Sequence, residues 1–108
     1  MAERPRLVIS SGDPAGIGPE VTLKALAQPE IEELADCVVT GDARALESTA
    51  QRFGLPLPHL VEPAGDARGV EPGRLSAAAG RAAAEAAARG VELVQAGRAQ
   101  ALVTAPLN

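Results

Sequence analysis

The sequence contains a single cysteine, a single histidine and a single aromatic residue. Cys37 has no second cysteine with which to form an intrachain disulfide or a metal-ligand pair, and we expect it to pack in the core. Phe53 alone provides no platform on which nucleic-acid bases could stack. No apolar run approaches the roughly 20 residues needed to cross a bilayer, and the apolar stretch near the N-terminus is too short for a signal peptide. We therefore expect a cytoplasmic protein with no membrane partner.

The chain also has little basic charge. Ten basic residues stand against fourteen acidic ones, which gives a formal net charge of −4, and the basic residues are scattered singly. This pattern lacks the positive patch that nucleic acids and anionic lipids require, so we expect no nucleic-acid partner. The 108 residues, 46% hydrophobic and 22% charged, are typical of one globular domain.

Short β-branched runs alternate with helical patterns along the chain. Runs at 6–11, 36–40 and 101–104 predict buried strands, and the proline-rich stretch 57–61 predicts a short edge strand. Helices are predicted at 18–27, 43–53 and 77–96, with Asp42 and Ser76 as N-caps. The alternation of strands and helices predicts a three-layer α/β fold with a mostly parallel sheet.

Three finer expectations concern packing. Ile17, Val21 and Ala25 fall on one side of the first helix and predict its apolar face. Gly80 and Gly90 lie inside the long alanine-rich helix, where glycine is unfavourable, so we expect another backbone to pack closely against both. No covering helix follows the last strand, and we therefore expect residues 1–108 to be the N-terminal part of a longer protein.

The densest candidate for function is the stretch from Gly12 to Glu20, which joins a buried strand to a helix. In a parallel sheet this junction lies at the carboxyl edge, where ligands bind beside helix N-termini. It does not match the dinucleotide fingerprint, because Val21 stands where the third glycine would be, and it lacks the lysine of a P-loop. A tight turn without a ligand remains the alternative.

A second candidate is the stretch from Thr104 to Asn108, which follows the last strand. Because the first and last strands are expected to be parallel, this stretch and the Gly12–Glu20 loop emerge at the same edge and face one crevice. An ordinary strand end is the alternative. His59 is interpreted as a surface residue, and Ser10 and Ser11 lack a partner base, so the segment offers no catalytic residue and no metal ligands.

Three blocks of this sequence resemble 4-hydroxythreonine-4-phosphate dehydrogenases. They are Ser11 to Glu20, Gly73 to Ser76 and Ala101 to Asn108, which occur in the family's order and spacing. The resemblance covers essentially the whole chain and matches the N-terminal third of the family. It implies a fold related to isocitrate and isopropylmalate dehydrogenases and a homodimeric enzyme of vitamin B6 biosynthesis.

The resemblance also implies a reaction and ligands. Family members oxidise 4-phosphooxy-L-threonine with NAD or NADP, and the β-keto acid loses CO2 to give 3-amino-2-oxopropyl phosphate. A divalent metal, such as Zn, Mg, Mn or Co, is held by histidines in the part of the family that this segment does not match. By analogy, Asp13, Gly16, Ile17 and Gly18 would border the cofactor, and Thr104 and Asn108 would border the small phosphorylated substrate.

Two other functions stay open at this point. A paralogous enzyme could act on a four-carbon sugar-acid phosphate, such as threonate or erythronate 4-phosphate, since no residue of the segment is known to choose between these substrates. A non-catalytic domain could hold a phosphate-bearing ligand at the helix that starts near Gly18. In either the dehydrogenase or its paralogue, the segment alone is expected to be inactive.

Overall fold

The computed structural model describes residues 4–106. Strands and helices alternate along the chain, apart from one additional short helix, as the sequence predicts. Their bounds, in chain order, are β1 (Arg6–Ser10), α1 (Gly18–Leu26), α2 (Pro29–Leu34), β2 (Asp36–Gly41), α3 (Ala43–Phe53), β3 (Leu60–Pro63), α4 (Ala77–Gln95) and β4 (Ala101–Thr104).

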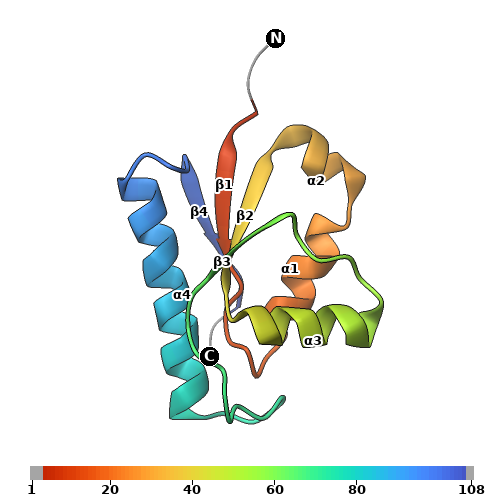
Figure 1. Ribbon diagram of the computed structural model, residues 1–108, viewed down its shortest axis with the longest axis vertical. Coiled ribbons are helices and arrows are strands. Elements are labelled where there is room, and N and C mark those ends of the chain that lie inside the picture. Colours follow the sequence, from red (N-terminus) through yellow and green to blue (C-terminus); the bar gives the residue numbers. More distant parts are fainter. Residues whose placement is uncertain (1–3, 107–108) are drawn as a thin grey trace.

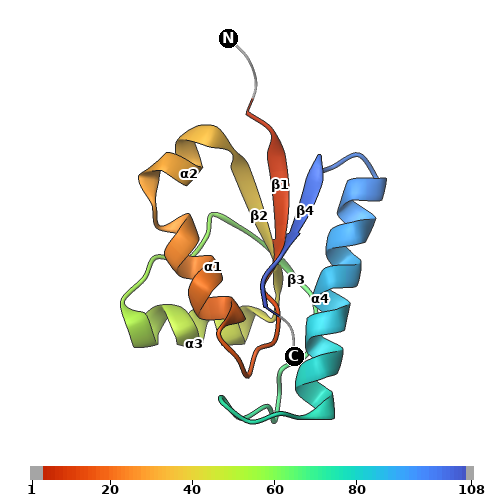
Figure 2. The same ribbon diagram turned by 180° about the vertical axis from the view of Figure 1, so that it is seen from behind.

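The four strands form one parallel sheet in the order β3-β2-β1-β4. Helix α4 lies on one side of this sheet and α1, α2 and α3 lie on the other (Figure 1), and the view from behind shows the same separation (Figure 2). The predicted three-layer α/β fold with a parallel sheet is therefore confirmed. The carboxyl ends of all four strands point to the same edge, because every pairing is parallel.

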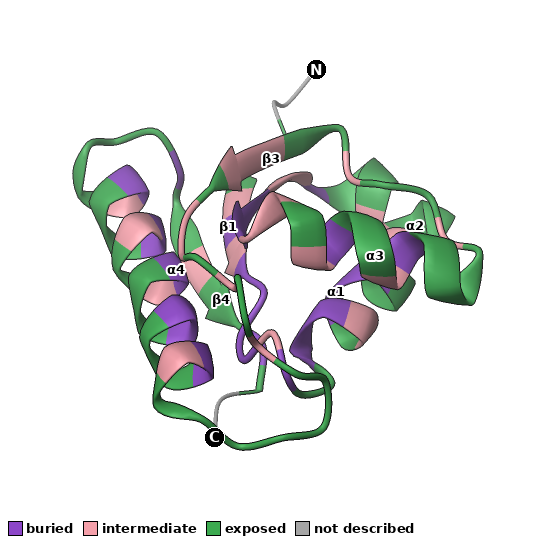
Figure 3. Ribbon diagram, turned by 60° about the horizontal axis from the view of Figure 1, so that its bottom comes forward, coloured by how far each residue is buried: buried purple, intermediate pink, exposed green. Residues whose placement is uncertain are grey.

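Two apolar clusters hold the layers together. On one face, Leu23 of α1 and Leu46 of α3 pack with Val39 of β2, and all three side chains are at most 1% exposed. On the other face, Val8 of β1 packs with Leu93 of α4. Figure 3 shows the buried stripe along α4. It consists largely of small residues, namely Ala79, Ala82, Ala83, Ala86 and Gly90, so the helix backbone lies close to the sheet.

Both predicted N-caps are present. The Ala45 amide donates to Asp42 Oδ1 at 2.9 Å, and the Ala79 amide donates to Ser76 Oγ at 3.1 Å. Each cap satisfies an amide that has no partner within its own helix. The short helix α2 was not expected, because Pro29 reads as the end of the preceding helix. Proline is also favourable at the first position of a new helix, and Pro29 occupies that position.

The expected apolar face of α1 is wrong. Ile17 and Val21 are 59% and 44% exposed, whereas Thr22 and Leu23 are buried. Helix α1 packs chiefly against α3, and this contact turns Thr22 and Leu23 inward. The outward position of Ile17 places an apolar side chain on the surface at the carboxyl edge.

The two glycines of α4 differ in their surroundings. A Cβ atom added at Gly90 would lie 2.7 Å from Cδ1 of Leu102 in β4, so the expected close packing is confirmed there, with a side chain as the neighbour. A Cβ atom added at Gly80 would have no neighbour within 4 Å, and the expectation is wrong for that position. Gly80 lies in the first turn of α4, where the helix surface is open to solvent.

We predict that Gly80→Ala stabilises the chain by about 0.5–1 kcal/mol, because alanine loses less backbone entropy in a helix and meets no obstacle here. Gly90→Ala gains the same entropic stabilisation, but the new methyl group forces Leu102 to move. Its net stabilisation is therefore smaller or negative. Urea unfolding of both variants measures the difference. An equal gain from the two substitutions would contradict the close contact at Gly90.

We predict that Leu46→Ala lowers the free energy of unfolding by about 2–5 kcal/mol, since Leu46 is 1% exposed and its removal leaves a cavity between α3 and the sheet. The matched control is Leu75→Ala, because Leu75 is 74% exposed, and its effect should stay within about 0.5 kcal/mol. Chemical denaturation measures both. Similar losses from the two variants would show that the cluster around Leu46 is not the core.

Candidate functional site at the carboxyl edge of the sheet

The loop between β1 and α1 is built around Asp13. The Asp13 side chain is 3% exposed, and its Oδ1 accepts a hydrogen bond from the Ala15 amide at 2.8 Å. The Asp13 carbonyl accepts a second bond from the Gly16 amide at 3.0 Å. These two bonds fold the loop tightly and direct it into the N-terminus of α1, where the first amides have no partner within the helix.

The four residues expected to border a cofactor therefore lie in one loop, but not all of them are on its surface. Gly16 and Ile17 are exposed, whereas Asp13 and Gly18 are buried. A Cβ atom at Gly18 would collide with the Ser11 carbonyl, so only glycine allows α1 to begin this close to the end of β1. Gly16 and Ile17 are thus the residues that a ligand could touch, and Asp13 and Gly18 shape the loop.

The first loop and the end of β4 meet directly. The Asp13 amide donates to the Pro106 carbonyl at 3.1 Å, and the Ala105 amide donates to the Ser10 carbonyl at 2.9 Å. Gly12 has a φ of +79°, and a side chain at this position would collide with the Pro106 carbonyl. The predicted convergence of the two segments on one edge is confirmed. Thr104 is exposed at this edge, beside Ser10, and Asn108 lies outside the described residues.

The segment between β3 and α4 also folds against the first loop, which the sequence did not indicate. The Gly73 amide donates to the Ala15 carbonyl at 2.6 Å, and the Ala67 amide donates to Asp42 Oδ2 at 2.8 Å. Gly65, Gly69 and Gly73 all have positive φ values. Their spacing of four residues was the available signal, but it predicts turns and not the direction in which the segment folds.

A pocket of about 330 Å³ lies between α3 and these two loops. Its floor on α3 carries Arg44, Ser48 and Arg52, and its rim includes Pro14 and Gly16 of the first loop. This pocket was not predicted, because three of its polar side chains lie along a helix and not at the strand ends. The spacing of Arg44, Ser48 and Arg52, four residues apart on a predicted helix, was the signal that could have found their shared face.

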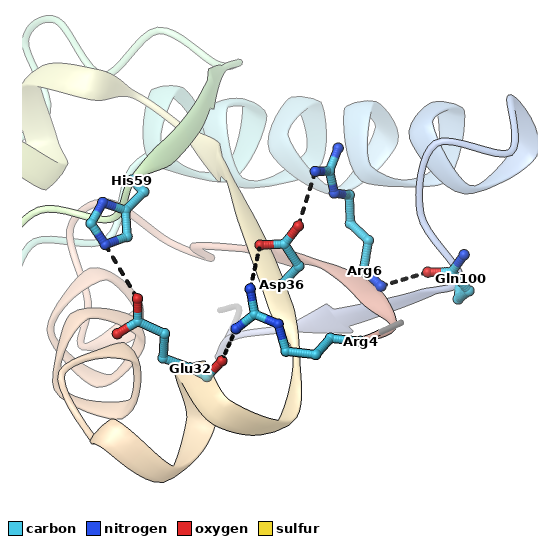
Figure 4. Close-up of polar contacts among 6 residues, drawn as sticks. All are labelled: Arg4, Arg6, Glu32, Asp36, His59 and Gln100. Carbon is cyan, nitrogen blue, oxygen red and sulfur yellow. Dashed lines mark hydrogen bonds and ion pairs between the residues drawn. The ribbon is translucent and has the colours of Figure 1, made fainter. Parts of the chain in front are cut away.

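The opposite edge of the sheet carries a polar network (Figure 4). Arg6 pairs with Asp36 at 3.0 Å and joins β1 to β2, and the Arg4 guanidinium donates to the Glu32 carbonyl. His59 Nε2 lies 3.5 Å from Glu32 Oε1, and its side chain is 89% exposed, as expected for a surface histidine. These contacts lie at the amino edge of the sheet. The loops described above lie at its carboxyl edge.

Cys37 lies on β2 near this amino edge and is partly buried. Burial raises the pKa of its thiol, and the neighbouring Asp36 carboxylate raises it further. Such a thiol holds little thiolate at neutral pH, which is unlike the depressed pKa of reactive cysteines. The thiol is therefore not of the reactive kind, but Cys37 is only partly buried and lines a surface pocket, so the expected place in the core is wrong.

Residues 4–106 contain no group of three or more histidine, cysteine, aspartate or glutamate side chains placed to hold a metal ion. In the same part of the chain, no helix combines the length and the apolar character needed to span a bilayer.

Comparisons with known proteins agree with the motifs at this edge. A scan against family models finds no match. A 4-hydroxythreonine-4-phosphate dehydrogenase from Xanthobacter autotrophicus is 40% identical over 94% of this chain and 33% of its own length. A D-threonate 4-phosphate dehydrogenase from Salmonella typhimurium is 35% identical over 98% of this chain and 38% of its own length.

A solved structure shows the same fold. The crystal structure of a 4-hydroxythreonine-4-phosphate dehydrogenase from Burkholderia phymatum matches 99% of this chain and 38% of its own chain, with a TM-score of 0.88 and 32% sequence identity. The chain thus spans little more than a third of the length of the relatives it matches. Sequence and fold together place it among these dehydrogenases: the chain belongs to the 4-hydroxythreonine-4-phosphate dehydrogenase family.

Proposed function

We propose that this chain is the N-terminal part of an NAD- or NADP-dependent dehydrogenase that oxidises 4-phosphooxy-L-threonine. Loss of CO2 from the oxidised acid would then give 3-amino-2-oxopropyl phosphate, a step in pyridoxal phosphate biosynthesis. The observation that carries the proposal is the contact between the Asp13 loop and the end of β4, which joins two family motifs at one edge. The names of the relatives support an oxidoreductase acting on a small phosphorylated acid.

The residues at this edge suit a nicotinamide cofactor. Ile17 is 59% exposed and offers an apolar surface to a flat ring, and Gly16 beside it has no side chain to obstruct the approach. The N-terminus of α1 carries the positive end of the helix dipole, which favours the negatively charged phosphates of such a cofactor. Asp13 and Gly18 would act by holding the loop in this shape.

The substrate would lie beside the end of β4. The Thr104 side chain is exposed there and could donate a hydrogen bond to a carboxylate or hydroxyl of the substrate. Asn108 is proposed to border the same crevice. The divalent metal would be held by residues that the described part of this chain does not supply, and it would polarise the hydroxyl that is oxidised. A homodimer is proposed on the family resemblance alone.

A paralogous activity on D-threonate 4-phosphate is the second candidate. One of the similar relatives carries that name, and its 35% identity is close to the 40% of the 4-hydroxythreonine-4-phosphate dehydrogenase. The two substrates differ in the group on the carbon next to the carboxylate, an amino group or a hydroxyl. A non-catalytic phosphate-binding domain is a weaker alternative, since both of these relatives are named as dehydrogenases.

The test is a kinetic assay of the full-length protein that contains this chain. Formation of NADH or NADPH is followed with 4-phosphooxy-L-threonine and with D-threonate 4-phosphate, each in the presence of Mg²⁺, Mn²⁺ or Zn²⁺. A higher kcat/KM for the first substrate supports the proposal, and a higher value for the second supports the paralogue. No reduced cofactor with either substrate and any metal would refute both.

We predict that Ile17→Ser in the full-length protein raises the KM for the nicotinamide cofactor by about tenfold, because it removes an apolar contact worth roughly 1.5 kcal/mol. The control is Val91→Ser, because Val91 is 43% exposed on α4, which lies on the other side of the sheet from α1 (Figure 1). Initial rates at varied cofactor concentration give the KM of each variant for the cofactor. An unchanged KM in Ile17→Ser would remove this residue from the cofactor site.

A further inference from the structure

The pocket on α3 has an unusual distribution of charge. It contains three arginines, Arg44, Arg52 and Arg68, and two carboxylates, Glu20 and Asp42. Both carboxylates already have partners within the protein. Glu20 pairs with Lys24 at 2.6 Å. The two Asp42 oxygens accept from the amides of Ala45 and Ala67 at 2.9 and 2.8 Å.

Two of the three arginines form no close ion pair within the described part of the chain. Arg68 pairs with Asp66 at 2.8 Å, and its hydrogen bonds lower the pKa of Asp66 to about 2, so this pair stays ionised near neutral pH. Within residues 4–106, neither Arg44 nor Arg52 forms an ion pair with a carboxylate. Arg52 lies over the Phe53 ring at 5.3 Å, and its guanidinium edges remain available for hydrogen bonds.

The position of Arg44 in α3 is unfavourable for the helix itself. Asp42 is the N-cap, so Arg44 stands in the first turn, where the helix dipole favours negative side chains. The helix dipole does not favour a cation there, and the carboxylate whose pKa Arg44 helps to lower, Asp66, is already hydrogen-bonded to Arg68. A negatively charged ligand in the pocket would compensate the charge of Arg44.

The spacing along α3 suits one such ligand. Arg44, Ser48 and Arg52 follow each other at intervals of four residues and all line the pocket. The Cα atoms of the two arginines are about 12 Å apart along the helix axis, and Ser48 stands midway between them. Its hydroxyl makes no hydrogen bond within the described residues. Two guanidinium groups and a hydroxyl could therefore converge on one tetrahedral anion from the same side.

Part of the remaining wall of the pocket is apolar. Pro14 of the first loop, Phe53 of α3, and Val70 and Pro72 of the segment before α4 contribute to it. Guanidinium groups bind phosphate oxygens in pairs through their planar fork, and the apolar side chains would contact the organic part of a phosphate ester. We infer that this pocket binds a phosphate monoester, with Arg44, Ser48 and Arg52 holding the phosphate and the apolar wall holding its organic group.

The inference does not rest on the dehydrogenase activity, because it can be tested without turnover. The full-length protein that contains this chain is titrated with phenyl phosphate and with inorganic phosphate at constant ionic strength, and amide shifts are followed by NMR. Saturable shifts at Ser48, Thr49 and Arg52 are expected for both probes. Phenyl phosphate should bind more tightly because it also contacts the apolar wall. Absence of saturable shifts at these amides would overturn the inference.

Variants test which side chains hold the phosphate. Arg44→Gln and Arg52→Gln should each weaken phenyl phosphate binding at least about tenfold, since each removes charge-assisted hydrogen bonds. Arg44→Lys keeps the charge and should lose less. Arg81→Gln on α4 removes the same charge outside the pocket and should leave the Kd unchanged.

An equal loss of affinity in Arg81→Gln and Arg44→Gln would show that only net charge matters, and this would overturn the inference. Circular dichroism of each variant establishes that α3 still forms. If Arg44→Gln does not fold, the Kd of Arg44→Lys for phenyl phosphate is compared with that of Arg81→Gln. Weaker binding in Arg81→Gln together with an unchanged Kd in Arg44→Lys would contradict a specific site.

Discussion

The pairing of β1 with β4 is the constraint on which the functional edge depends. Parallel register places Ser10 beside Thr104, and the chain on both sides then continues into loops that are hydrogen-bonded through Asp13 and Pro106. Gly12 makes this possible, because no other residue combines a φ of +79° with the absence of a side chain facing the Pro106 carbonyl. The start of α1 at Gly18 and the end of β4 at Thr104 are 86 residues apart in sequence, and this contact brings them to one edge.

The parts of the fold that the sequence predicts are those with local causes. β2 is recognisable from its β-branched run because a strand covered by helices on both faces needs apolar residues throughout. Asp42 and Ser76 are recognisable as caps because each satisfies an amide only three residues away. The shared edge of β1 and β4 followed from one additional rule, that strands joined through helices are parallel.

The parts that the sequence did not predict depend on distant contacts. The inward face of α1 is set by its packing on α3, so Leu23 and Thr22 are buried where the periodicity favoured Val21. The fold of the segment before α4 is set by single hydrogen bonds from Gly73 and Ala67 to the loops after β1 and β2. Neither bond can be predicted from the local sequence, since the backbone N–H of almost any residue can donate a hydrogen bond.

Two departures from local preference lie close to the carboxyl edge of the sheet. Ile17 exposes apolar surface at the start of α1, and Arg44 places a positive charge in the first turn of α3, against the helix dipole. An apolar ligand surface would cover Ile17, and a bound anion would compensate the charge of Arg44. Gly16 links the two positions, because it is next to Ile17 in the loop and also lines the pocket that contains Arg44. Sequences that fold well satisfy their local preferences nearly everywhere, so two exceptions at one edge support the binding that we propose there.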